Sequence, residues 1–189
     1  MPRVLSQTRP TLNALQLLNP DSELSAWAGA AGRAELKKGL VAFLAAQSMQ
    51  LPAEWVLSAG GVVLDPGRTQ ILLLQKRSSG AWLLPKGRVE PREPADAAAR
   101  REILEETGYR TRLGSLIGLQ VRSNGVASRV KVILWFKAEA VPGRPVSDGE
   151  CKTYGIFWRP VATALQEIAS EPARSLVRMA AGQVLKGSG

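Results

Sequence analysis

Apolar residues recur along this chain with two different periods, and the period changes near residue 52. Leu36, Leu40, Phe43 and Leu44 are spaced i, i+4, i+7 and i+8, which marks one face of an α-helix running through about Gln47. Beyond residue 54 the apolar residues gather in short β-rich runs instead. These runs predict strands over residues 56–64, 71–76, 111–120, 130–138 and 154–159.

Turn residues at 65–67, 124–125 and 142–143 separate the predicted strands. A final helix or two is expected over residues 161–185, interrupted near Pro172. The pattern predicts an α/β domain over residues 51–189, preceded by a helical extension over residues 1–50 whose role stays open. At 189 residues the chain is long enough to bury a proper core.

One further helix carries the clearest chemistry, within the segment 87–109, GRVEPREPADAAARREILEETGY. Pro94 suits a first helical position and Gly108 a left-handed C-terminus, so the helix should run from about Pro94 to Thr107. Glu102, Glu105 and Glu106 then share one face. Three carboxylates so close repel one another, unless the face holds a divalent cation such as Mg²⁺ or Mn²⁺, which takes hard oxygen ligands. A solvated acidic face is the ordinary alternative for any one of them.

Ahead of this helix, Lys86-Gly87-Arg88 is interpreted as a basic glycine turn at the helix entrance. Backbone amides and the helix dipole favour phosphate at such a position. A carboxylate helix opened by a basic turn therefore indicates phosphoryl chemistry.

The same segment resembles the Nudix box: Gly, five residues, Glu, seven residues, Arg-Glu, an aliphatic residue, any residue, Glu-Glu, any residue, Gly and an aliphatic residue. Tyr109 alone departs, in place of the final aliphatic residue. The matching positions are Gly87, Glu93, Arg101, Glu102, Ile103, Glu105, Glu106 and Gly108.

The resemblance covers about residues 54–170 and implies the Nudix fold, a mixed sheet sandwiched between helices. It implies that Glu102, Glu105, Glu106 and the Lys86 carbonyl hold catalytic Mg²⁺ or Mn²⁺. It also implies that Arg101 and Glu93 form an ion pair that fixes the loop against the helix, with Arg101 supporting the catalytic carboxylates. The reaction would be attack of water on a phosphorus atom of a diphosphate linkage.

Such a reaction needs a group that accepts a proton. The chain has no His, which excludes Ser/His/Asp and Cys/His nucleophilic machinery and leaves a carboxylate as the expected base. The resemblance implies either a Glu of the box or a Glu on a later loop as this base, and Glu150, with Asp148 beside it, is the candidate on a later loop. The single Cys151 is expected to be a plain thiol in a reducing compartment, and too few soft ligands remain for a zinc site.

The formal net charge is +9, divided as +2 over residues 1–50, +1 over 51–110 and +6 over 111–189. A basic field beside a metal site steers polyanions toward it, although a basic surface can also serve solubility alone. The cations expected to meet substrate phosphates are Arg77, Lys86, Arg88, Arg129 and Lys131.

The segment from Trp82 through Glu90 narrows the choice of polyanionic substrate. It resembles the Nudix branches that cleave dinucleoside polyphosphates, diphosphoinositol polyphosphates or nucleoside triphosphates. A non-catalytic nucleotide-binding module is the alternative, but such modules typically lose box carboxylates. Nucleic acid is the least favoured partner because aromatic residues are scarce. No apolar run is long enough for a membrane span and no signal layout is visible, so we expect a cytoplasmic protein, with a homodimer left open.

Overall fold

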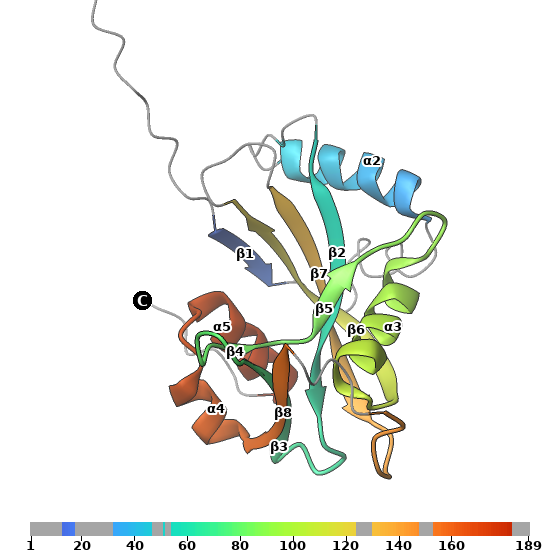
Figure 1. The fold of residues 1–189 in the computed structure, drawn as a ribbon. Helices are drawn as coiled ribbons and strands as arrows, with labels where there is room; N and C mark the ends of the chain where they lie inside the picture. The colour runs from blue at the N-terminus through green and yellow to red at the C-terminus, as the bar shows by residue number, and fades with distance from the viewer. Residues whose placement is uncertain are drawn as a thin grey trace, which may run out of the picture.

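The structure, a computed structural model, describes residues 13–17, 32–46, 51, 54–123, 130–147 and 153–182. Within these ranges eight strands form one mixed sheet, in which β2 and β7 run parallel and the other pairs run antiparallel. The strand order is β1-β6-β7-β2-β3-β4, with β5 paired to β2 and β8 to β3 (Figure 1). The strands are β1 (Asn13–Leu17), β2 (Val56–Leu64), β3 (Gln70–Lys76), β4 (Trp82–Leu83), β5 (Lys86–Arg88), β6 (Thr111–Arg122), β7 (Lys131–Ala140) and β8 (Tyr154–Pro160).

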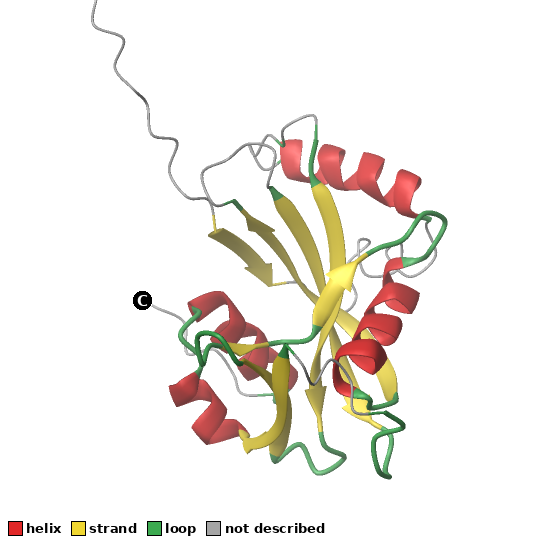
Figure 2. Cartoon of the chain, in the orientation of Figure 1, coloured by secondary structure: helices red, strands yellow, loops and turns green. Residues whose placement is uncertain are grey.

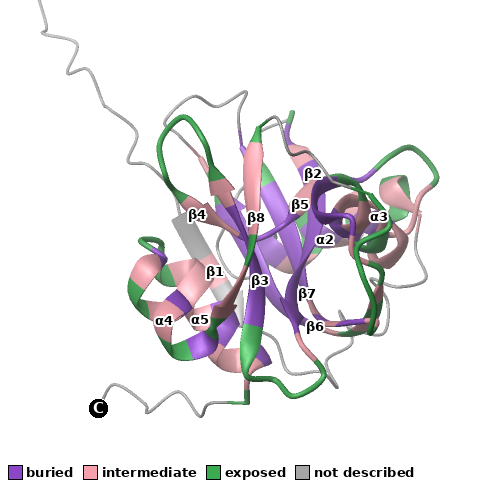
Figure 3. Ribbon diagram, turned by 60° about the horizontal axis from the view of Figure 1, so that its bottom comes forward, coloured by how far each residue is buried: buried purple, intermediate pink, exposed green. Residues whose placement is uncertain are grey.

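Helices cover both faces of the sheet (Figure 2). α2 (Arg33–Ala45) and α3 (Ala95–Thr107) lie on one face, while α4 (Val161–Glu167) and α5 (Glu171–Ala180) lie on the other. β2 supplies both cores because its side chains alternate: Leu57 packs with α2 and α3, and Val62 packs with α4 and α5. This two-sided burial explains why β2 is almost continuously apolar, and Figure 3 shows the buried residues gathered along the central strands.

The helix predicted from the N-terminal leucine spacing is α2. Leu36, Leu40 and Leu44 are each at most 2% exposed, because this stripe faces the sheet and the buried alanines of α3. α2 is therefore part of the main core. Among the described residues, no helix is both long and apolar enough to cross a lipid bilayer.

The prediction for the N-terminal residues needs correction, whereas the predicted break near Pro172 is confirmed. The first 50 residues were expected to be helical, but β1 lies within them and extends the sheet by pairing with β6. The break in the C-terminal helices falls at residues 168–170, and Pro172 lies in the first turn of α5, where its missing N–H costs nothing. The five predicted strands and the two terminal helices are confirmed, and β4 and β5 are additional strands.

Candidate active site

β5 lies between β2 and α3 and brings the basic segment to the carboxylate helix. Gly60 stands opposite Lys86 in the β2–β5 pairing, and a side chain on Gly60 would collide with Lys86 and with the Pro85 carbonyl. The absence of a Cβ at this position lets the two strands approach. The interpretation of residues 86–88 as a turn at the helix entrance is therefore wrong: they form a strand, and residues 89–94 separate it from α3.

The hydrogen bonds of this strand pair fix the direction of the β5 carbonyls. Gly61 N–H donates to the Pro85 carbonyl (3.1 Å) and Val89 N–H donates to the Leu57 carbonyl (3.1 Å). Lys86 and Arg88 occupy the intervening positions that do not bond to β2, so their carbonyls point away from it. The Arg88 carbonyl accepts a hydrogen bond from Arg101 of α3 (2.9 Å). The Lys86 carbonyl therefore points to the same side.

Lys86 and Gly87 contact the C-terminal half of α3. The Lys86 N–H donates to Glu106 Oε2 (2.7 Å), and Glu106 is only 9% exposed. The Glu102 carboxyl lies over Gly87, in the space that a Cβ at that position would fill. Two of the three predicted carboxylates thus contact β5 directly.

Arg101 joins the loop to the helix through its whole guanidinium group. Its Nε and Nη2 donate to the two oxygens of Glu93 (2.9 Å each), while Nη1 donates to Glu102 Oε1 and Glu105 Oε2 (2.9 Å each). The hydrogen bonds from Arg101 hold the pKa of Glu93 below its ordinary value. Because the planar guanidinium group of Arg101 is hydrogen-bonded on both sides, it fixes the orientation of these carboxylates. A lysine ammonium group could not do so.

The three carboxylates differ in their surroundings. The Glu102 side chain is 14% exposed, and burial raises its pKa even though Arg101 opposes the shift. Glu105 is 54% exposed at its side chain, so it meets solvent on the outer side of the cluster. Glu106 is the most enclosed of the three.

The donor set matches a hard divalent cation, because carboxylate and carbonyl oxygens are the ligands that Mg²⁺ and Mn²⁺ prefer. Glu102 and Glu106 both contact β5. The Lys86 carbonyl points away from β2, toward the side of β5 on which α3 lies. Among the described residues, no group of three acidic side chains is placed to hold a metal ion as it stands. Arg101 donates hydrogen bonds to both Glu102 and Glu105. The residues fit a metal, because Glu102 and Glu105 each accept from Arg101 Nη1 through one of their two carboxylate oxygens.

The Lys86 ammonium lies among both signs of charge. Burial lowers its pKa, as do the nearby Lys131 and Arg122, while Glu106 and Glu102 raise it. Arg122 ends β6 and is paired with Lys131 at the start of β7. The Lys86 side chain is half-buried, and its ammonium interacts with carboxylates of α3 and with two exposed cations of the sheet. Groups of both signs near one another can hold a divalent cation and a chain of phosphates together.

The remaining predicted residues are distributed differently. Gly108 closes α3 in the left-handed conformation (φ 75°), as expected. Arg77 is exposed where β3 meets β8, and its N–H donates to the Thr153 carbonyl (3.1 Å). Arg129 and the proposed base Glu150, with Asp148 and Cys151, lie outside the described residues.

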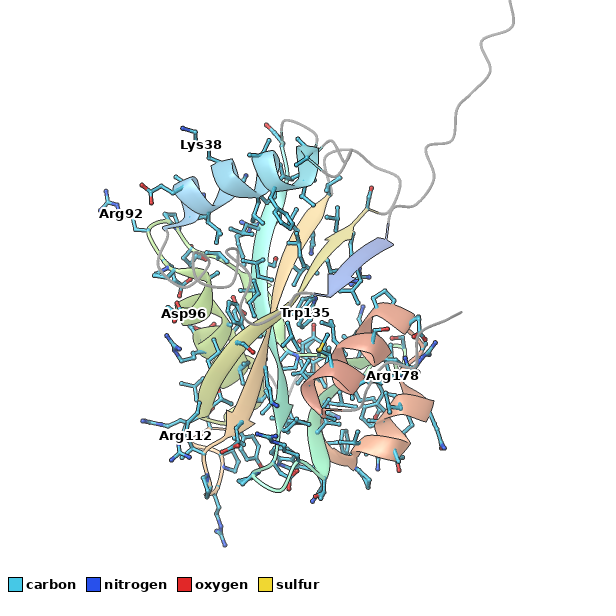
Figure 4. The ribbon with its side chains drawn as sticks, turned by 180° about the vertical axis from the view of Figure 1, so that it is seen from behind. Lys38, Arg92, Asp96, Arg112, Trp135 and Arg178 are labelled. Carbon is cyan, nitrogen blue, oxygen red and sulfur yellow. The ribbon has the colours of Figure 1, made fainter. Side chains whose placement is uncertain are left out.

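Sequence reasoning missed Arg122 on β6 and a buried hydrogen bond between β6 and β7. The predicted strand stopped at Gln120, although alternation continued through Val121 would have added Arg122. Gln120 is 4% exposed and accepts a hydrogen bond from Trp135 Nε1 (3.0 Å). Figure 4 shows Trp135 near the centre of the molecule.

The chain is similar in sequence and fold to Nudix proteins. The family profile of the NUDIX domain matches residues 55–179, which leaves β1 and α2 outside it. A solved structure titled as the MutT NUDIX hydrolase from Burkholderia pseudomallei is similar, with a TM-score of 0.53 at 26% identity, covering 70% of this chain and 99% of that one.

Two curated relatives resemble shorter parts of the chain. A Bacillus subtilis (strain 168) protein named "Putative 8-oxo-dGTP diphosphatase" is 53% identical over 97 residues, covering 51% of this chain and 61% of the relative. Diphosphoinositol polyphosphate phosphohydrolase 3-alpha of Mus musculus is 41% identical over 49 residues, covering 26% of this chain and 30% of the relative. The chain thus spans less than two thirds of the length of these relatives.

Proposed function

The chain belongs to the Nudix family, and on that premise we propose that it hydrolyses a diphosphate linkage in a nucleoside polyphosphate, either a nucleoside triphosphate or a dinucleoside polyphosphate. The observation that carries this proposal is the position of Lys86. Its N–H binds the carboxylate of Glu106, and its ammonium stands beside Arg122 and Lys131. One residue therefore joins the metal-ligand side of the site to the cationic side.

Glu102, Glu106 and the Lys86 carbonyl would hold Mg²⁺ or Mn²⁺, with Glu105 as the exposed and displaceable ligand. Nudix hydrolases generally use divalent ions, and a bound ion lowers the pKa of water and offsets charge on the phosphate oxygens. Arg101 keeps Glu102 oriented while Glu93 holds the guanidinium in place. Lys86, Arg122 and Lys131 would bind the phosphates on the leaving side. Glu150 stays our candidate for the base that takes the proton from water.

A matched screen tests this proposal. Mg²⁺-supported hydrolysis would be measured for nucleoside triphosphates including 8-oxo-dGTP, dinucleoside polyphosphates, nucleotide sugars and diphosphoinositols. Glu106→Gln serves as the inactive control. Turnover of a nucleoside polyphosphate that Glu106→Gln abolishes supports the proposal, whereas binding without turnover of any substrate would favour a non-catalytic module.

The cations Lys86, Arg122 and Lys131, which we call the cationic cluster, allow a second, quantitative test. Because each added phosphate can meet a further cation, Lys131→Ala should raise KM more for a dinucleoside tetraphosphate than for a nucleotide sugar. Lys38→Ala is a suitable control, since Lys38 is an exposed cation that projects from α2 away from the sheet (Figure 4). Equal effects on both substrates would refute the polyphosphate assignment and leave the diphosphatase assignment untouched.

Diphosphoinositol polyphosphate is the second candidate substrate. It is favoured by the similarity to the mouse phosphohydrolase over 49 residues. The same screen separates the two, because an enzyme of that class would turn over diphosphoinositols faster than any nucleotide.

A further inference from the structure

A cationic hollow lies on the α2 side of the molecule, and two of its six lining residues come from outside the family domain. It has a volume of about 220 Å³. We call it the α2 pocket, lined by Arg33, Lys37, Trp55, Val56, Leu57 and Arg88. Arg33 and Lys37 belong to α2, which precedes the matched domain, and Arg88 belongs to β5.

Main-chain acceptors hold two of these cations in place. Arg33 Nη1 donates to the Val89 carbonyl (3.2 Å), and Lys37 Nζ donates to the Trp55 carbonyl (3.0 Å) while lying 4.2 Å from the centre of the Trp55 ring. Trp55 itself is 8% exposed. Both side chains are thus oriented before any ligand arrives, which reduces the entropy lost on binding.

Positive charge in the pocket is not neutralised by ion pairs. Among the described residues, none of Arg33, Lys37 and Arg88 forms a salt bridge with a carboxylate. Burial lowers the pKa of Lys37 and the charge of Arg33 lowers it further, while the exposed Glu54 opposes the shift. Like charges held together at a half-buried position are a cost that a bound anion would remove.

We propose that the α2 pocket binds a single phosphate group. The volume is below the roughly 300–1,000 Å³ of pockets that take drug-sized ligands, so a small anion suits it better than a whole nucleotide. Two guanidinium groups and an ammonium supply the fork and point-charge donors that phosphate oxygens accept.

The pocket is connected to the catalytic side through one residue. Arg88 lines it, and the Arg88 carbonyl accepts the hydrogen bond from Arg101, which holds Glu93, Glu102 and Glu105. The phosphate can come from free inorganic phosphate or from a distal phosphate of the substrate. Either source would require the same three donors.

Calorimetric titration with inorganic phosphate, at constant ionic strength and without divalent metal, tests the pocket. Arg33→Gln and Lys37→Gln should each weaken binding by at least about tenfold, the effect of losing one charge-assisted hydrogen bond. Lys38→Gln, the exposed neighbour on α2, should bind like the parent protein. Lys131→Gln distinguishes phosphate bound beside Lys86 on the catalytic side from phosphate bound in the α2 pocket.

Two further measurements keep the result interpretable. Circular dichroism would show whether each variant keeps α2, and Arg88→Gln tests the pocket from β5 in case a change in α2 unfolds the helix. Equal phosphate affinity in the parent, Arg33→Gln, Lys37→Gln and Arg88→Gln, or loss of binding only in Lys131→Gln, would overturn the proposal.

Inhibition kinetics then separate the two sources of phosphate. Phosphate that competes with substrate in the parent, but not in Arg33→Gln, identifies the pocket as a subsite for a substrate phosphate. Non-competitive inhibition that is lost in Arg33→Gln identifies a separate site for free phosphate. Both results support the pocket. The titration needs no turnover, so it remains decisive if the proposed hydrolase activity fails.

Discussion

Gly87 offers a sharp test of the site, because a single methyl group there should move a catalytic carboxylate without unfolding the protein. A Cβ at position 87 would meet the carboxyl carbon and both oxygens of Glu102. The backbone of Gly87 does not need a positive φ, so Ala at this position is free of backbone strain. The flexible end of Glu102 must therefore move away.

The size of the effect follows from the geometry. Ordinary contacts between non-bonded heavy atoms are about 3.5–4.0 Å, so the carboxyl has to shift by more than about 1 Å. A displacement of about 1 Å in a catalytic group can cost about a hundredfold in rate. The stability change should be small, since a partly exposed ion pair such as Arg101–Glu102 contributes about 0–1 kcal/mol and Gly→Ala in a strand recovers a similar amount.

We expect Gly87→Ala to melt within a few degrees of the parent and to lose about two orders of magnitude in kcat, measured by scanning calorimetry and steady-state hydrolysis. Gly60→Ala is the contrasting control. Its Cβ would strike the Pro85 carbonyl and the Lys86 backbone, which cannot rotate away, so this variant should be destabilised instead.

A double-mutant cycle makes the reasoning refutable. If Gly87→Ala acts by displacing Glu102, adding it to Glu102→Gln should cause almost no further loss of kcat. Full additivity of the two changes, or parent-like turnover of Gly87→Ala, would show that the position of Glu102 over Gly87 is irrelevant to catalysis.

Three further outcomes are expected. Glu106→Gln should lower kcat by at least about a hundredfold, the scale of losing one preorganised charge, and near-parent turnover in Mg²⁺ would exclude Glu106 as a ligand. Leu40→Ala should lower the free energy of unfolding by about 2–5 kcal/mol, because Leu40 is fully buried against the sheet. Val41→Ala, at a 45% exposed position on the same helix, should change the free energy of unfolding by about 0.5 kcal/mol or less; equal effects in urea titrations would mean that α2 does not pack as described. Glu93→Gln should remove a pH dependence of stability. Because the pKa of Glu93 is depressed, its ion pair with Arg101 stabilises the fold above pH 4.5, and this stabilisation is lost as the pH falls through the folded-state pKa. The stabilities of the parent and the variant should therefore converge in acid. A constant difference between their melting temperatures from pH 7 to 3 would contradict this.

The sequence was most informative where local signals agreed with tertiary structure. The carboxylate helix had helix-forming alanines, a Pro at its start and Gly108 at its end, so its bounds were predicted to within one residue. α2 was predicted because three of its four periodic residues are buried in the core. Two strands without a strand-forming sequence, β1 and β5, were not predicted.

β5 and β1 illustrate that limit. Lys86-Gly87-Arg88 has no strand-forming residue, and it is extended only because Gly60 leaves space beside it. The β1 sequence Asn-Ala-Leu-Gln-Leu favours helix by composition, yet pairing with β6 makes it a strand. The division of the chain at residue 50 therefore stays a prediction, which deletion of residues 1–50 would test. Burial of three leucines, at about 1.5–3 kcal/mol each, approaches the whole stability of an ordinary domain, so we expect the deletion to unfold it.

Two glycines, Gly60 on β2 and Gly87 within β5, explain why this site cannot be predicted from the box helix alone. Gly60 lets the strand approach β2 from one side, and Gly87 lets the Glu102 carboxyl approach the strand from the other. With β5 so placed, the Lys86 amide binds Glu106, its carbonyl points away from β2, and its ammonium stands beside the cations of β6 and β7. A larger residue at either glycine would break one of these relations while leaving every box carboxylate in the sequence. The spacing of the box thus predicts the proposed ligands, and the position of β5, which depends on Gly60 and Gly87, determines whether they can act together.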